Sequence, residues 1–257
     1  MVRDASVWLA AALLAYAVAV NAAWWASERA PASLGRRIDA FLAVSRWLYL
    51  GGLPLAALGT GVMPLWLAGW TMPASWPVAV AGALLAAGIG AAVLGVAAND
   101  GPEGARGSDR PGGGRRRPSF ERLGACCADV VLREAHWGFV RAGVVAAAPG
   151  WFAVPGGAYV ALGQALILGL LFAEIWVHPH ARHAAIDPDG ARAASALGVA
   201  AAASHLGWMI AGTAGAGLAA HAVVALVALR YPPGGTTPKP SISPDRPMAV
   251  IEPTIVG

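Results

Sequence analysis

Long apolar segments alternate along the chain with shorter polar stretches. A helix needs roughly 17 to 25 mostly apolar residues to cross a bilayer. Segments of that length are predicted as membrane spans at 5–26, 40–62, 75–97, 123–147, 153–177, 193–212 and 215–231. A shorter apolar piece at 63–72, with Trp66 and Trp70, is expected at the membrane interface, where Trp is favoured. The pattern therefore predicts an all-α protein, a polytopic transmembrane helical bundle of about seven spans.

The composition supports a membrane protein. Hydrophobic residues make up 57% of the 257 residues and charged residues 12%, whereas an average soluble domain is about 25% charged. These values exclude a disordered chain, a coiled coil and an ordinary cytosolic enzyme. Of the 18 basic residues only Lys239 is a lysine, and together with the abundant Ala and Gly this indicates a high-GC prokaryotic genome. We expect the protein in the inner membrane of a bacterium.

The basic side chains predict how the helices are oriented. Positive residues collect in cytoplasmic loops. The stretches after the first, third and fifth spans and the C-terminal tail are basic, whereas those after the second, fourth and sixth spans carry almost no Lys or Arg. The N-terminus is therefore predicted outside and the C-terminus in the cytoplasm. No aromatic residues interleave with the basic run at 106–117, so nucleic acid is not an expected partner.

Composition also divides the chain into parts. Residues 1–98 form a predicted N-terminal part with three spans. The Gly-, Pro- and Arg-rich stretch 99–118 is predicted to be a flexible cytoplasmic linker. Residues 119–231 form a predicted core of four spans. The Pro-rich stretch 232–257 is predicted to be a disordered tail.

The fourth predicted span carries an unusual number of ionisable side chains. Charged groups inside a bilayer are costly, so each one needs a reason. Glu134 and Arg141 are two helical turns apart and share one face, whereas Asp129, Arg133 and His136 share the opposite side. A helix with two polar stripes cannot face lipid on both, so we expect other helices to enclose it or a cavity to lie along it.

Structural and catalytic interpretations of these residues are both open. Glu134 and Arg141 fit a buried ion pair that joins helices, and Asp129 with Arg133 fits a pair at i and i+4. A buried glutamate near histidines is also a usual catalytic arrangement. His205 lies in the sixth span and His221 in the seventh. The fourth, sixth and seventh helices can therefore bring these two histidines to Glu134 in the core of the bundle.

A second group of metal-ligating residue types lies at the end of the fifth span. Glu174, His178, His180 and His183 have the residue types of a metal site. Pro179 breaks the helix there, so we interpret this stretch as an interfacial loop at the cytoplasmic boundary.

The segment from about 121 to 230 resembles the CPBP family of intramembrane proteases, which includes the type II CAAX prenyl endopeptidases. The family pattern is EExxxR on one helix, FxxxH on a later helix, and a final His in an Hxxx(N/D/B) helix. Phe139 and Arg141 resemble the family's F-R-G ending. His205 lies where the second-motif His would be, and His221 resembles the final one.

The sequence departs from the family pattern at several positions. His136 and Trp137 occupy the two glutamate positions, and Glu134 lies one turn earlier on the face of the family arginine. Ala201 stands in place of the Phe, and Ala225 in place of the Asn or Asp. The motifs are therefore degenerate and support the fold more than the activity.

The resemblance implies an endopeptidase acting on a membrane-associated protein or peptide. Glu134, helped by a histidine such as His136, would activate water for attack on a peptide bond. His205 and His221 would stabilise the oxyanion, and Arg141 would orient the glutamate. No cofactor or metal is expected, and a zinc site built from the same histidines and glutamate is the variant.

Two other function classes compete with the protease. One is a non-catalytic pseudoenzyme or scaffold of the same fold, which the missing motif residues favour. The other is a proton-coupled transporter, since intramembrane ionisable residues also build proton relays. Against a transporter, the two parts of the chain show no repeat. The lipid bilayer is an expected partner in every case.

Overall fold

The computed structural model describes residues 2–29, 32–62, 68–70, 72–73, 75–99, 120–151, 158–178, 182 and 188–229. Helices account for nearly all of these ranges, and no strand occurs within them. In chain order the helices are α1 (Val2–Arg29), α2 (Ala32–Trp47), the π-helix η1 (Leu48–Gly52), α3 (Leu53–Gly59), α4 (Trp76–Asn99), α5 (Phe120–Trp151), α6 (Ala158–Val177), α8 (Pro188–Ala211) and α9 (Ala214–Leu229). The all-α prediction is confirmed.

Five of the predicted membrane spans coincide with helices long and apolar enough to cross a bilayer. In the described part of the chain these are Val7–Ala26, Ala40–Gly59, Trp76–Val96, Val160–Val177 and Ala193–Ala211. The fourth predicted span lies in α5, which has 32 residues but is interrupted by charged side chains. The seventh lies in α9, which is apolar but only 16 residues long.

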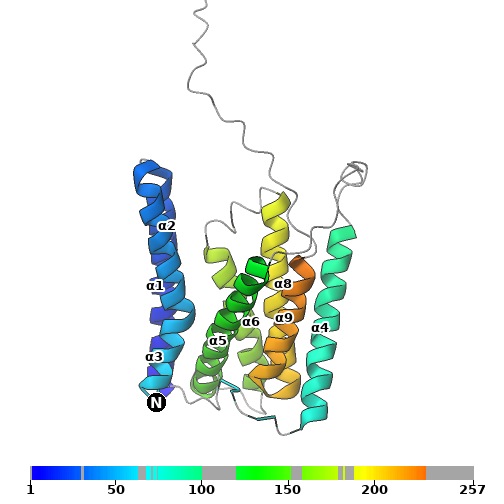
Figure 1. Cartoon of the computed structure of the whole chain (residues 1–257). Helices are drawn as coiled ribbons and strands as arrows, with labels where there is room; N and C mark the ends of the chain where they lie inside the picture. Colours follow the sequence, from blue (N-terminus) through cyan, green and yellow to red (C-terminus); the bar gives the residue numbers. More distant parts are fainter. Residues whose placement is uncertain are drawn as a thin grey trace, which may run out of the picture.

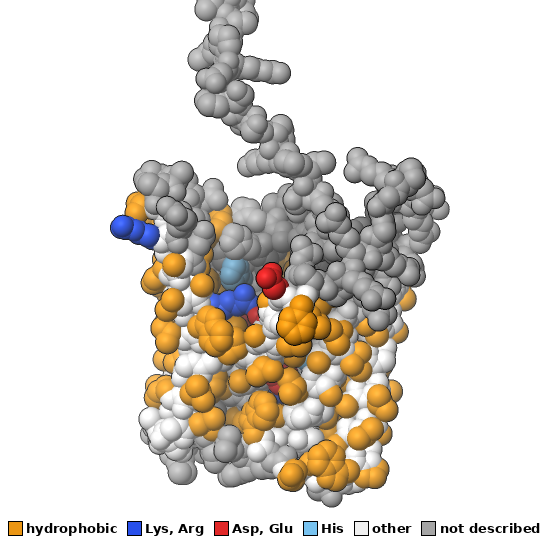
Figure 2. Space-filling view, viewed as in Figure 1, with side chains coloured by type: hydrophobic (Ala, Val, Ile, Leu, Met, Phe, Trp, Pro, Cys, Tyr) orange, Lys and Arg blue, Asp and Glu red, His pale blue; other side chains and the backbone are white. Residues whose placement is uncertain are grey.

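The helices run alternately up and down in one bundle (Figure 1). The C-terminal ends of α1, α4, α6 and α9 lie at the upper end in Figure 1, and the N-terminus lies at the lower end. Helix α5 packs against α1, α6, α9 and η1, whereas α4 packs on α8 and α9. On the face seen in Figure 2, many apolar side chains are exposed between the two ends of the bundle. The neighbouring helices bury α5 from Glu134 onward, whereas Val131, nearer its N-terminus, is exposed.

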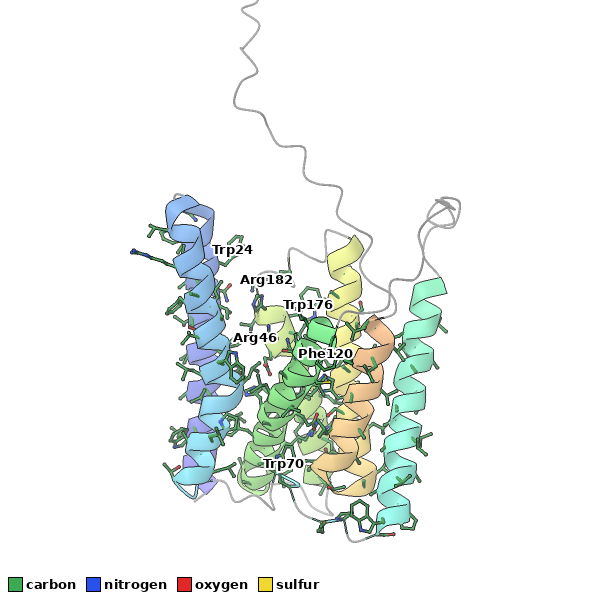
Figure 3. The ribbon with its side chains drawn as sticks, viewed as in Figure 1. Trp24, Arg46, Trp70, Phe120, Trp176 and Arg182 are labelled. Atoms are coloured by element: carbon green, nitrogen blue, oxygen red, sulfur yellow. The ribbon has the colours of Figure 1, made fainter. Side chains whose placement is uncertain are left out.

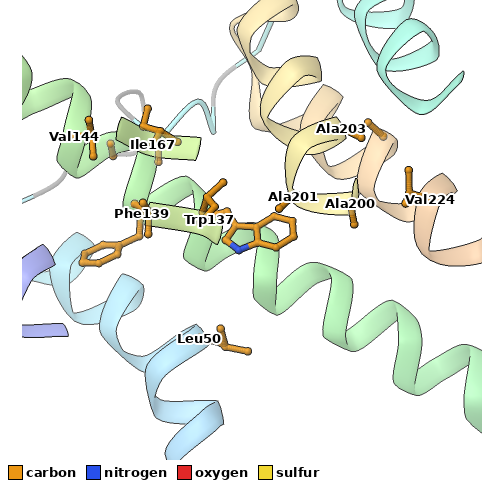
Figure 4. Packing of buried hydrophobic residues seen from close by; sticks show 14 of the residues in the cluster. Leu50, Trp137, Phe139, Val144, Ile167, Ala200, Ala201, Ala203 and Val224 are labelled. Carbon is orange, nitrogen blue, oxygen red and sulfur yellow. The ribbon is translucent and has the colours of Figure 1, made fainter. Parts of the chain in front are cut away.

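Side chains of α5 reach in several directions into the apolar core. Trp137 points toward Ala200 and Ala201 of α8, while Phe139 leaves the helix in a different direction (Figure 4). Trp137, Phe139 and the following Val140 are almost fully buried. The prediction that other helices enclose this helix agrees with the structure from Glu134 onward, whereas Val131 is exposed.

A π-helix interrupts the second predicted span. Helices α2, η1 and α3 follow one another without a gap, so that η1 inserts a wider turn at Leu48–Gly52. A π turn changes which residues face the neighbouring helices, and such turns are frequent at functional sites. Within η1, Tyr49 and Leu50 are buried, whereas Leu48 is exposed. Tyr49 thereby faces α5.

Small residues let α4, α8 and α9 approach closely. A Cβ added to Gly90 of α4 would lie 2.5 Å from Cγ2 of Val224 in α9. A Cβ added to Gly207 of α8 would lie 3.0 Å from the carbonyl oxygen of Ala216. Helices in membranes commonly pack through such residues, because no side chain then separates the backbones.

The apolar piece between α3 and α4 folds back onto the bundle where it is described. Ala68 and Gly69 are buried, and the backbone N–H of Ala214 donates to the carbonyl oxygen of Gly69 at 2.8 Å. Gly69 has φ 78°, which favours glycine. Trp70 lies beside Gly138 of α5. Residues 68–70 thus pack on α5 and on the turn between α8 and α9, and the interfacial placement of 63–72 stays a prediction.

Other predictions fall on parts of the chain outside the described residues. They are Trp66, the linker at 99–118 apart from Asn99, and the tail at 232–257.

Candidate functional site

Glu134 lies at the centre of a closed polar group between α5 and α8. Its side chain is fully buried. Arg141 Nη1 donates to Glu134 Oε1 at 2.6 Å, and Ser204 Oγ donates to Oε2 at 2.6 Å. A second nitrogen of Arg141, Nη2, donates to Ser204 Oγ. As the seven-residue spacing predicts, Glu134 and Arg141 share a face and form an ion pair, with Ser204 linking the pair to α8.

Burial makes this ion pair costly to form and costly to break. Neither Glu134 nor Arg141 is exposed, and two charges removed from water must compensate each other through close contact and hydrogen bonds. The ring of Trp208 adds a cation–π contact, since its centroid lies 5.7 Å from Cζ of Arg141. The carboxylate is thus held rigidly.

His221 brings α9 to the same carboxylate. Its Nδ1 lies 3.7 Å from Glu134 Oε2, slightly beyond a direct hydrogen bond. The imidazole stacks on Trp137 with 4.5 Å between ring centroids. Because the stacking fixes the plane of the ring, His221 presents Nδ1 to the carboxylate in a defined orientation.

His205 lies beside this group on α8, directly after Ser204. It is buried, and neither of its ring nitrogens has a hydrogen-bond partner in the described part of the chain. Its ring stacks on Trp208 at 5.8 Å between centroids. Glu134 and Arg141 both act electrostatically on it. Three helices therefore gather four of the predicted site residues, which with Ser204 we call the Glu134 cluster (Glu134, Arg141, Ser204, His205 and His221).

Gly217 allows α9 to approach this cluster. A Cβ at this position would lie 2.8 Å from Glu134 Oε1 and 2.9 Å from the carbonyl oxygen of Ser204. Such distances are too short for an unstrained contact, so any larger residue would displace the carboxylate or the helix.

His136, the fifth predicted site residue, lies in a different place. Two residues along a helix correspond to a rotation of about 200°, so His136 faces away from the Glu134 cluster. Its Nε2 lies 3.1 Å from Glu174 Oε2 in α6. Its ring lies 4.2 Å from that of Tyr49, which stacks on Tyr16 at 3.8 Å. We call this group the His136 cluster (Tyr16, Tyr49, His136 and Glu174).

The other polar stripe of α5 continues from the His136 cluster toward the upper end of the bundle. Arg133 Nε donates to Asp129 Oδ2 at 2.8 Å, as expected for residues at i and i+4. Arg46 from α2 also donates to Asp129, and its side chain lies between α2 and α5 (Figure 3). This stripe joins α2 to α5.

The alternative hypothesis of a zinc site has little support in the described residues. No group of three or more His, Cys, Asp and Glu side chains converges there as a metal site. His136 is paired with Glu174, on the side of α5 away from Glu134. His180 and His183 lie outside the described residues.

Sequence reasoning missed several residues that the structure places at these sites. Ser204 directly follows four alanines at 200–203 and precedes His205, and a hydroxyl group at that place is a usable signal. Gly217 stands in a small-residue run at 214–217, which indicates close packing but not its partner. Nothing in the pattern indicated that Glu174 pairs with His136 or that Tyr49 faces it.

Comparison with known proteins identifies no relative. No protein-family model matches the chain, and neither a curated protein nor a solved structure gives a match. The resemblance to CPBP proteases therefore rests on the motif residues of the sequence alone.

Proposed function

We propose that the protein is an integral membrane hydrolase that cleaves a peptide bond of a membrane-associated substrate, in the manner of CPBP proteases. The observation that carries this proposal is the meeting of Glu134 and His221 between α5 and α9. A fully buried carboxylate oxygen lies 3.7 Å from an imidazole nitrogen. A buried carboxylate beside a histidine is an arrangement that general-base catalysis uses.

The chemistry follows from these positions. A water molecule that hydrogen-bonds both Glu134 and His221 has to lie to one side of the 3.7 Å line between them, since each bond needs about 2.8 Å. Glu134 takes a proton from this water as the oxygen of the water attacks the scissile carbonyl carbon. His205, with both ring nitrogens unpartnered within the described residues, is available to donate to the resulting oxyanion. Collapse of the oxyanion then breaks the C–N bond, and Glu134 gives its proton to the leaving nitrogen.

Arg141 and Ser204 also support a second candidate function. They already occupy both oxygens of the Glu134 carboxylate. A carboxylate engaged in this way stabilises a bundle without catalysis, as expected for a pseudoenzyme or scaffold of the same fold. The two candidates differ in whether the carboxylate charge is needed for hydrolysis or only for stability.

Glu134→Gln tests the two candidates directly. Glu174→Gln is the matched control, because it removes a second buried carboxylate outside the Glu134 cluster. Membranes from cells producing each variant are labelled at free N-termini, and the new termini are identified by mass spectrometry. Cleavage products that depend on the wild-type protein should fall to background in Glu134→Gln and persist in Glu174→Gln.

Other outcomes of the Glu134→Gln experiment would refute the hydrolase or favour one of the other two functions. Unchanged products in Glu134→Gln at wild-type protein levels would refute the hydrolase. An absence of dependent products, together with lowered thermal stability of Glu134→Gln, would favour the scaffold. Proton-coupled flux into proteoliposomes that requires Glu134 would support a transporter instead.

We further propose that the chain crosses a bacterial inner membrane seven times, with the N-terminus outside. Helices α5 and α9 run alongside the five apolar helices (Figure 1), which supports counting them as spans. The ends of α1, α4, α6 and α9 that precede the basic stretches lie together. Fluorescent-protein and alkaline-phosphatase fusions at Ser108 should report the cytoplasm, and phosphatase activity there would refute this topology.

A further inference from the structure

The His136 cluster lies on the side of α5 that the proposed hydrolysis does not use. His136 is fully buried and Glu174 nearly so, with 3.1 Å between Nε2 and Oε2. Ionisable groups inside a membrane bundle are expensive and usually functional. We propose that this cluster is a proton-binding site, in which His136 takes up one H⁺ that Glu174 compensates.

The hydrogen bonding of His136 is what points to a proton as the ligand. An ionised Glu174 is an acceptor only, so Nε2 of His136 must carry the hydrogen that lies between them. In the neutral ring Nδ1 then presents a lone pair. Nδ1 is buried and lacks a hydrogen-bond partner among the described residues. Adding H⁺ to Nδ1 gives an imidazolium beside a carboxylate, with no other bond made or broken.

Several helices contribute ionisable side chains to the surroundings of His136. They are Tyr16 from α1, Arg46 from α2, Tyr49 from η1, Asp129 and Arg133 from α5, and Glu174 from α6. Both arginines pair with Asp129, whereas Glu174 pairs with His136. Glu174 is therefore the carboxylate that compensates the added proton.

The cluster has a polar connection to the surface. The side chain of Asp129 is 38% exposed, that of Arg133 is 18% exposed and that of His136 is fully buried. These residues follow one another along the same side of α5, so side-chain exposure decreases stepwise from the upper end of the bundle inward. Polar side chains thus lead from the surface to Arg133, which lies about one helical turn from His136.

Tyr49 gives the cluster a second unusual polar atom. Its hydroxyl group is buried and has no hydrogen-bond partner among the described residues. The π-helix η1 places this ring against His136. Two unpartnered polar groups on neighbouring rings are costly for a merely structural core, which favours a site that exchanges a ligand.

Nuclear magnetic resonance of ¹⁵N-histidine-labelled protein in nanodiscs tests this proposal. His136→Gln assigns the ring signals of His136. We expect these signals to change in one step as the pH is lowered through the range in which an imidazole takes up its second ring proton. Glu174→Gln should move the midpoint down by at least about one pH unit, because it removes the compensating charge. Glu134→Gln should leave the midpoint unchanged.

His205 is an internal control in the same spectra, because it is buried without a carboxylate partner in the described structure. It should stay neutral over the range. Absence of titration at His136, or the same midpoint in Glu174→Gln, would overturn the proposal. If Glu174→Gln does not fold, Glu174→Asp retracts the carboxylate and should lower the midpoint by a smaller amount. An unchanged midpoint in that variant would count equally against the site.

Discussion

Removing one partner of the buried ion pair should destabilise the bundle far more than removing both. Arg141→Met takes away the guanidinium that donates to Glu134 Oε1 at 2.6 Å. Methionine fills a similar volume, so the lost charge dominates the effect. Glu134 then keeps a fully buried carboxylate with Ser204 as its remaining close donor. An uncompensated charge of this kind costs about 3–5 kcal/mol.

The combined variant Glu134→Met with Arg141→Met separates charge from packing. Replacing a buried pair by apolar residues of similar size is often neutral or stabilising. The hydroxyl of Ser204 loses its acceptor, which costs about 1–3 kcal/mol. We therefore expect the combined variant to be at least about 1 kcal/mol more stable than Arg141→Met alone.

The assay is reversible unfolding in mixed detergent micelles, with the unfolded fraction followed by circular dichroism. Arg133→Met is the control, because its partner Asp129 is 38% exposed and partly exposed pairs are worth at most about 1 kcal/mol. A loss below about 1 kcal/mol for Arg141→Met would refute the reasoning. So would a combined variant that is no more stable than the single one.

Three further changes test single contacts by thermal unfolding of the purified protein. Gly217→Ala should lower the free energy of unfolding by about 1–3 kcal/mol, because the added Cβ would lie 2.8 Å from Glu134 Oε1. Gly95→Ala is the control and should not lower it, because a Cβ there has nothing within 4 Å. Ser204→Ala should lower the free energy of unfolding by about 1–3 kcal/mol, because Glu134 loses the hydrogen bond from the hydroxyl. An unchanged free energy of unfolding would mean that this hydrogen bond is weak. Tyr49→Phe should be neutral or stabilising, since the removed hydroxyl has no partner among the described residues; a marked loss would reveal a partner for it.

The spacing within α5 predicted much of the candidate site. Seven residues separate Glu134 from Arg141, so helical geometry alone places them on one face, and the structure joins them. The same geometry separates His136 from Glu134. His136 was nevertheless included in the predicted catalytic set, where it occupies the first glutamate position of the family pattern.

Contacts between helices were less predictable. Ser204 reaches Glu134 across 70 positions of chain, and apolar periodicity carries no information about which face of one span meets which face of another. The π-helix at η1 was missed for a related reason, since a regular period of 3.6 residues was assumed throughout. Span positions were better predicted, because length and hydrophobicity are local properties of a segment.

The two polar faces of α5 also constrain how the protein is made. In the proposed seven-span topology, the part of α5 at 123–147 is a span with four charged side chains. Such a span inserts poorly on its own, since each Asp, Lys or Arg near the centre of a span costs about 2.5–3.5 kcal/mol at the translocon. The tyrosines that cover one face belong to α1 and η1, which are synthesised earlier. Ser204 and His221, which contact the other face, emerge last. In this topology the polar side chains of α5 need water or a chaperone around them until α8 and α9 have been synthesised. The last two helices of the chain therefore complete the assembly of the bundle.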